Sequence, residues 1–241
     1  MYNQERLLNR GAMPASGPHA ARFDAGLRAH MLRIYNYMAS GVLLTGLVAL
    51  FVASTPALYQ PIFGTPLKWA VMFAPLAFVF FFSFRIDRMS ASAAQTAYWA
   101  FAGVMGLSMA SIFLVFTGMS IAQTFFIAAA MFTAMSLYGY TTKADLSRFG
   151  SFLIMGVVGV LIASLVNLFL GSSALQLAIS VIGVLVFVGL TAWDTQNIKA
   201  RYAANLGHES ETKMAVFGAL SLYLNFVNIF QLLLNLTGER E

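Results

Sequence analysis

The sequence predicts an all-α integral membrane protein, a bundle of seven transmembrane helices. Hydrophobic residues make up 59% of the 241-residue chain and charged residues only 10%, whereas about 25% of the residues in soluble domains are charged. Seven apolar segments are each about as long as the roughly 20 residues that cross a bilayer as a helix. Nearly all lysines and arginines fall in the amino-terminal segment and in alternate connections, a pattern typical of oriented membrane helices.

The first 33 residues are polar. No short apolar core with a small-residue cleavage site precedes the first apolar segment, so we expect no cleaved signal peptide. We expect residues 1–33 to form a mobile cytosolic tail, with a short surface helix around Phe23 to Arg33 as the alternative. The membrane domain then covers residues 34–241. The tail contains five arginines, which are Arg6, Arg10, Arg22, Arg28 and Arg33.

The seven predicted spans are joined mostly by short connections. Connections of this kind place successive helices antiparallel in a bundle. The longer connections are those after the first and the sixth span. The spans are expected at residues 34–54, 67–84, 96–117, 121–141, 150–170, 174–195 and 214–237.

The basic residues predict how the bundle is oriented. Apart from Lys68 and Arg240, each of the 14 lysines and arginines lies in the tail or follows the second, fourth or sixth span. Because cytosolic segments carry the excess of lysine and arginine, we expect a cytosolic amino terminus and a carboxyl terminus on the opposite side. The net charge of +5 is then explained by contact with phospholipid headgroups, and no nucleic-acid partner is expected.

Polar side chains form one stripe along the last predicted span. Their spacings of three and four residues place them within an arc of about 120° on a helix. Unpaired amides in hydrocarbon cost several kcal/mol each, so this face must look into the bundle or into water. It either makes interhelical hydrogen bonds, worth about 1 kcal/mol or less each, or it lines a hydrated path. The stripe consists of Ser221, Asn225, Asn228, Gln231 and Asn235.

Asp194 ends the apolar run from Leu175 to Trp193, and the next basic residue is Lys199. One interpretation is a helix terminus that faces headgroup water. However, Gln196 to Ile198 contain no helix breaker, and a helix that continues to Lys199 would draw Asp194 inside the membrane boundary. An acid that faces the interior of a membrane bundle is a functional candidate.

Enzyme activity and a resident cofactor are not expected. The chain has no cysteine, which excludes disulfides, thiolate metal sites and thiol catalysis. Residues 214–237 contain no lysine for a retinal Schiff base. Metalloprotease and phosphate-loop motifs are missing, as is a cation cage of several carboxylates. The three histidines lie outside the predicted spans, where they could not serve an intramembrane serine protease; they are His19, His30 and His208.

Four segments of the chain resemble the bacterial branch of the Bax inhibitor family, the transmembrane Bax inhibitor motif proteins. They are Thr191–Gln196, Ala219–Phe230, Leu137–Lys143 and Phe84–Ser90, and the resemblance extends from about Phe23 onward. It implies a seven-helix bundle whose last helix is central and surrounded by the other six. It also implies a pH-responsive cation leak, chiefly for calcium, in the bacterial inner membrane. Some bacterial members are linked to a membrane-anchored ATP-dependent protease.

The resemblance also implies roles for individual residues. In the family, one aspartate on the sixth helix and one on the seventh share a proton and gate the path, and a basic residue on the second helix can pair with the sixth-helix acid. Asp194 matches the first aspartate and Arg85 the basic residue, but Asn225 stands where many relatives have the second aspartate. An aspartate that faces an asparagine has no coupled carboxylate, so we expect a weaker or shifted pH response. With amide oxygens alone beside it, Asp194 would bind a metal only weakly and transiently.

Three functional hypotheses follow. The first is a monomeric calcium or general cation leak channel, gated and pH-sensed at Asp194, Asn225 and Arg85 and lined by the other four polar residues of the last span. The second is a non-conducting regulator that binds a membrane complex such as the ATP-dependent protease. The third is a proton-coupled carrier that uses Asp194. Flux by the purified protein separates the first from the second, and countertransport separates channel from carrier.

Overall fold

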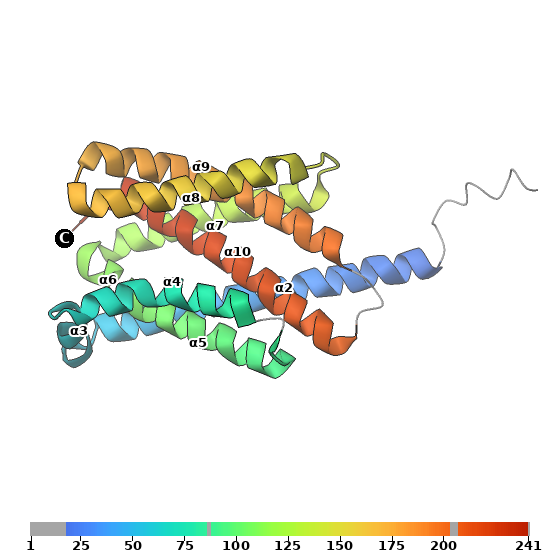
Figure 1. Ribbon diagram of the computed structural model, residues 1–241, viewed down its shortest axis with the longest axis horizontal. Coiled ribbons are helices and arrows are strands. Elements are labelled where there is room, and N and C mark those ends of the chain that lie inside the picture. Colours follow the sequence, from blue (N-terminus) through green and yellow to red (C-terminus); the bar gives the residue numbers. More distant parts are fainter. Residues whose placement is uncertain (1–17, 86–87, 203–206, 241) are drawn as a thin grey trace, which may run out of the picture.

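Helices make up almost all of the chain that the computed structural model describes, which is residues 18–85, 88–202 and 207–240 (Figure 1). Six of these helices are long and apolar enough to cross a membrane, and the pair α3 and α4 provides a seventh candidate. The protein is therefore an all-α integral membrane bundle. The helices are α2 (Pro18–Ala53), α3 (Pro56–Phe63), α4 (Leu67–Arg85), α5 (Ala91–Met109), α6 (Ile112–Val115), α7 (Gly118–Thr141), α8 (Ser147–Leu170), α9 (Ser173–Arg201) and α10 (His208–Thr237).

The helix α2 begins well before the predicted first span. Its 36 residues are about 54 Å long at 1.5 Å per residue, which exceeds the roughly 30 Å hydrocarbon core. The spacing of its buried side chains explains the extension, because Leu27, His30, Met31 and Ile34 form one packed face. The tail that was expected to be mobile through residue 33 is thus helical from Pro18 onward, and residues 1–17 lie outside the described residues.

Two features of the helices were not predicted: a short helix within the connection after the first span, and a break within the third span. The connection after α2 contains α3, which has Pro56 at its first turn and is bent by 88° from α4 across the segment from Gly64 to Pro66. Pro66 lies in this bend, and a proline cannot continue a helix from the preceding residues without the loss of a backbone hydrogen bond. The expected third span, 96–117, is instead α5 followed by the one-turn helix α6, with the break at Ala110 and Ser111.

The last helix is the most buried element of the bundle. In the most apolar 18-residue stretch of α10, 72% of the residues are buried, against 11% to 44% in the corresponding stretches of the other long spans. It crosses the middle of the molecule, with α8 and α9 on one side and α4 and α5 on the other (Figure 1). Its main neighbours are α9, α2, α7 and α5, whereas α4 packs on α5 and α8 packs on α9. The helix is central, as predicted, but four helices rather than six enclose it.

The basic connections gather at one end of the bundle. The Lys213 Nζ donates a hydrogen bond to the Met89 carbonyl oxygen at 3.1 Å, and the Lys199 Nζ donates one to the Tyr140 carbonyl oxygen at 2.8 Å. The carboxyl terminus lies at the other end (Figure 1), where the Thr117 N–H donates to the Glu239 carbonyl oxygen at 3.0 Å. The charge asymmetry of the sequence is therefore an asymmetry of the folded bundle.

Candidate functional site

Asp194 lies inside a continuous helix. The helix α9 runs on to Arg201, which is about 10 Å beyond Asp194 at 1.5 Å per residue. The interpretation of Asp194 as a helix terminus is therefore wrong. Its side chain is partly buried, and it points toward α10.

Two donors from α10 hold the Asp194 carboxylate. The Ser221 hydroxyl donates to Oδ2 of Asp194 at 2.7 Å, and the Asn225 amide nitrogen donates to the same oxygen at 2.7 Å. Ser221 and Asn225 are four residues apart, so they lie on the same face of α10. In the described part of the chain, Oδ1 of Asp194 accepts no hydrogen bond, so one oxygen ties α9 to α10 and the other stays free. The expectation that Asp194 and Asn225 face each other is met.

Arg85 does not accompany this carboxylate. It is exposed at the end of α4, and its guanidinium carbon lies 6.0 Å from the centre of the Phe81 ring. The physical reason is that α4 packs on α5 and not on the helix that carries Asp194. No ion pair involving Asp194 forms among the described residues, so the expected pairing with Arg85 is wrong for this structure.

The rest of the polar stripe on α10 does not bind neighbouring helices. The Asn228 amide donates to the Leu224 carbonyl oxygen of its own helix at 2.8 Å. Gln231 is partly buried and Asn235 is exposed, and within the described chain neither has a hydrogen-bond partner. Interhelical bonding thus accounts for Ser221 and Asn225 only. The side chains of Gln231 and Asn235 have no partner among the described residues and could bind water, as the hydrated-path hypothesis requires.

A hydrogen-bonded chain of hydroxyls, which the sequence did not reveal, reaches the residue next to Asp194. The Thr195 hydroxyl donates to the Thr191 carbonyl oxygen at 2.7 Å, so it must accept the hydrogen of Ser136 at 3.0 Å. Ser136 in turn accepts from the Tyr35 hydroxyl at 2.5 Å. The chain therefore has one donor direction, from α2 through α7 to α9, because its final acceptor is a carbonyl.

The first two hydroxyls of that chain line a cavity. It has a volume of about 630 Å³ and lies between α2 and α7, with Arg28 and Tyr140 also in its wall. Ser136 and Tyr35 were not singled out from the sequence because single hydroxyls within apolar runs carry no periodic signal. Only the packing of three helices shows that they meet.

Two glycines set the position of the Asp194 segment. A Cβ atom at Gly139 would lie 2.2 Å from the Ala192 carbonyl oxygen and 2.8 Å from the Ala192 Cα, and one at Gly150 would lie 2.5 Å from the Trp193 indole. Small residues let membrane helices approach closely. Gly139 of α7 and Gly150 of α8 thus bring two helices against the residues that precede Asp194. The Tyr-Gly-Tyr sequence around Gly139 was the available signal.

His30 was expected outside the membrane spans, but it falls within the candidate span Phe23–Ala53. It lies in α2 and is buried, with Nδ1 3.8 Å from a Glu211 carboxylate oxygen, while Arg33 lies 3.3 Å from the same oxygen. Among the described residues, no group of three or more histidine and acidic side chains is placed to hold a metal ion. The site geometry thus rests on one carboxylate with neutral partners.

The comparisons with known proteins agree with the family resemblance that the four sequence segments indicated. Residues 27–241 match the family model described as inhibitor of apoptosis-promoting Bax1. An uncharacterized protein of Rickettsia prowazekii is 47% identical over 91% of this chain and 93% of its own length. Inner membrane protein YbhL of Escherichia coli is 43% identical over 90% of this chain and 94% of its own length. An uncharacterized membrane protein of Streptococcus pyogenes is 34% identical over 90% of this chain and 96% of its own length. On this evidence, and on the helical bundle that carries it, the chain belongs to the Bax inhibitor family of membrane proteins.

Proposed function

We propose that this chain is a pH-responsive cation leak channel, with calcium as the permeant ion, gated where Asp194 of α9 meets Asn225 of α10. The observation that carries the proposal is a partly buried carboxylate whose Oδ2 accepts from Ser221 and Asn225 while Oδ1 has no partner among the described residues. Burying an acid inside a membrane bundle costs free energy, so an acid held this way is a functional candidate. A carboxylate oxygen that accepts no hydrogen bond and forms no ion pair among the described residues can bind a passing cation weakly, which conduction requires.

The same carboxylate supplies the pH response. Hydrogen bonds to a charged acceptor are about twice as strong as those between neutral groups, so a proton on Asp194 weakens the bonds that join α9 to α10. The proton also removes the charge that attracts a cation. One titration thus changes both the helix contact and the ion affinity. The polar stripe of Asn228, Gln231 and Asn235 continues from this point along α10 and provides the wall of the path.

The proposed setting is the bacterial inner membrane, where the protein works as a monomer. The relative from Escherichia coli is named an inner membrane protein, and the basic end of the bundle fits a cytosolic position because such segments favour that side. The amino terminus is then cytosolic and the carboxyl terminus periplasmic or extracellular. The cavity of about 630 Å³ between α2 and α7 would open on the cytosolic side.

A second function is favoured by one observation. Calcium takes six to eight oxygen ligands, usually with several carboxylates, and here Asn225 offers an amide where the paired arrangement has a second acid. A chain with this site fits a non-conducting regulator that binds a membrane complex, such as a membrane-anchored ATP-dependent protease. Flux by the purified protein separates the two functions.

The test is calcium uptake into proteoliposomes that contain the purified protein, at about pH 5.5 and about pH 8, for the wild type and Asp194→Asn. We expect uptake above that of empty liposomes, with a pH dependence that Asp194→Asn removes. An unchanged pH profile in that variant would refute the gate assignment. Absence of uptake from folded protein would favour the regulator.

Asp145→Asn is the matched control. Asp145 is exposed at the same end of the bundle, and the Ser147 N–H donates to its Oδ1 at 2.9 Å. This bond lowers the pKa of Asp145 below its ordinary value of 3.8. Its stabilising contribution is therefore present above that value and is lost only as the pH falls through the lower pKa of the folded state. Asp145 stays charged across the tested range, so Asp145→Asn should keep the pH profile of the wild type.

A further inference from the structure

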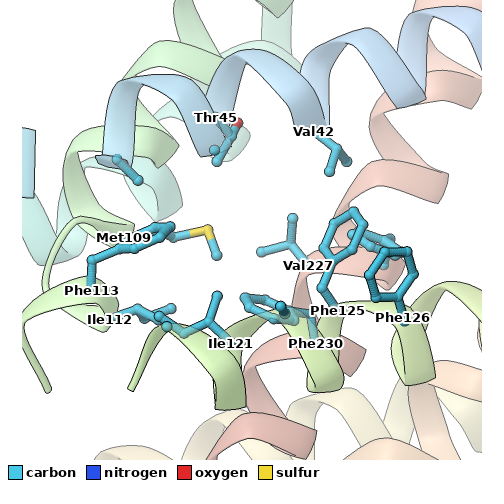
Figure 2. Close-up of a pocket in the computed structure, with 15 residues that line it drawn as sticks. Val42, Thr45, Met109, Ile112, Phe113, Ile121, Phe125, Phe126, Val227 and Phe230 are labelled. Atoms are coloured by element: carbon cyan, nitrogen blue, oxygen red, sulfur yellow. The ribbon is translucent and has the colours of Figure 1, made fainter. Parts of the chain in front are cut away.

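A second cavity lies between α2 and α7, nearer to the carboxyl-terminal end of the bundle. It has a volume of about 310 Å³, and α10 forms its inner wall. Figure 2 shows Val42 and Thr45 on α2 facing the aromatic and aliphatic side chains of α7 and α10 across an open centre. Its lining is almost entirely apolar and includes Val42, Met109, Ile121, Phe125, Val227 and Phe230.

Water is a poor occupant for this cavity. Its one hydroxyl, on Thr45, donates to the Ala102 carbonyl oxygen at 2.8 Å and accepts from the buried Tyr223 hydroxyl at 2.6 Å. No polar group of the lining is left for a water molecule, and a water in a cavity needs two to four polar partners. Apolar cavities of about half this volume stay dry and bind apolar molecules.

The cavity opens toward the lipid phase. The helices α2 and α7 each pack on α10. The rim residues Gly46, Ala122 and Phe126 are exposed, with Phe126 72% accessible. A Cβ atom at Gly46 would meet no heavy atom within 4 Å. Since these helices cross the membrane, the medium at this opening is hydrocarbon.

A cation lies at the end of the cavity nearest to the carboxyl terminus. Ile112 and Phe113 of α6 and Gly118 of α7 close that end, and Phe116 connects them. The Arg240 guanidinium carbon is 5.6 Å from the centre of the Phe116 ring. Arg240 is exposed and forms no ion pair among the described residues. The planar guanidinium of an arginine presents several N–H donors in an arrangement that fits the oxygens of a phosphate group.

We propose that a phospholipid binds here, with one acyl chain in the cavity between α2 and α7 and its phosphate at Arg240. The apolar lining, the opening toward lipid and the exposed cation at one end match the acyl chain, its point of entry and the phosphate of such a molecule. The acyl chain contacts Phe226, Val227 and Phe230 of α10 and thus occupies the space beside the central helix. The site stands whether or not the chain conducts ions.

The test uses the full-length protein in liposomes that contain a phospholipid with a photoreactive diazirine in its acyl chain, followed by mapping of the cross-links. We expect cross-links at Met109 and Phe230, which are buried and out of reach of lipid that only surrounds the bundle. Gly46→Leu fills the opening and should abolish these two cross-links. Gly159→Leu is the control, because Gly159 is exposed on α8 and also has open space at its Cβ position; it should retain them.

Two further outcomes decide the identity of the ligand. A diacylglycerol with the same diazirine chain has no phosphate, so it should label Met109 and Phe230 less than the phospholipid does. Arg240→Gln should lower labelling by the phospholipid to the diacylglycerol level. Equal labelling by both probes in the wild type would overturn the phospholipid assignment. Cross-links confined to outward-facing residues such as Phe126, and unchanged by Gly46→Leu, would overturn the site itself. If Gly46→Leu does not fold, Ala122→Leu at the opposite rim provides the same test.

Discussion

Gly139→Ala tests whether the close approach of α7 to α9 positions the candidate site. The added methyl carbon would lie 2.2 Å from the Ala192 carbonyl oxygen and 2.8 Å from both the Ala192 Cα and its carbonyl carbon. Carbon atoms pack at about 3.5 to 4.0 Å, so the two helices would have to separate by about 1 Å. The obstacle is backbone on a helix that other helices pack against, and it cannot be relieved by a rotamer change.

The magnitude follows from two opposing effects. Overpacking a well-packed interior costs about 1 to 3 kcal/mol and sometimes more. Replacing glycine by alanine within a helix gains up to about 1 kcal/mol from propensity. We therefore expect Gly139→Ala to lower the free energy of unfolding by about 1 to 2 kcal/mol. Gly103→Ala on α5 is the matched control, because its Cβ would meet no heavy atom within 4 Å, and it should raise the free energy of unfolding.

The assay is reversible unfolding of the purified protein in mixed micelles, with the two variants measured beside the wild type. Calcium uptake at acid and alkaline pH is measured on the same preparations, because separation of α7 from α9 moves the segment that carries Asp194. We expect an altered uptake profile in Gly139→Ala and a wild-type profile in Gly103→Ala. If Gly139→Ala is stabilised as much as Gly103→Ala, the close contact does not constrain the bundle and the reasoning is refuted.

Three other predictions concern the site, the core and the topology. Asn225→Asp would place a second carboxylate 2.7 Å from the first. At that distance the repulsion is roughly 6 kcal/mol at a dielectric constant of about 20, so the pair keeps a proton. The midpoint of pH-dependent uptake should therefore move toward neutral pH, and an unchanged midpoint would contradict this contact. Thr45→Val leaves the buried Tyr223 hydroxyl without its acceptor and should lower the free energy of unfolding by about 1 to 3 kcal/mol. Adding Tyr223→Phe should recover part of that loss. A double-mutant cycle that shows no coupling between the two residues would argue against the bond. Cysteines introduced at Gly207 and Glu241 should be labelled from opposite sides of the membrane, and labelling from one side would refute the seven-span topology.

The positions of most spans could be predicted from the sequence because apolar length is a local property. The expected spans at 67–84 and 150–170 correspond to α4 and α8 within a few residues. The extension of α2 could not be predicted in this way. Its first turns are polar in sequence. Leu27, Met31 and Ile34 are nevertheless buried there, and Ile34 packs against Gly218 of α10, which lies far along the chain.

The candidate site was predicted in part. The acid on α9 and the donors on α10 were identified from residue type and spacing, and they meet. The basic partner was not predicted correctly. Arg85 lies at the same end of the bundle as Asp194, but its helix, α4, packs on α5. Ser136 and Gly139 were missed because their roles depend on a neighbouring helix.

The sequence by itself determined that this chain crosses a membrane, where most of its apolar spans lie, that its basic residues share one end, and that the last helix has a polar face. These properties follow from composition, run length and the period of a single helix. Only the tertiary structure decided which helices enclose α10, which oxygen of Asp194 is bound, and where two cavities open between α2 and α7. These properties depend on side-chain volumes and on contacts between residues far apart in the chain, such as Gly139 and Ala192. No pattern within one helix encodes them.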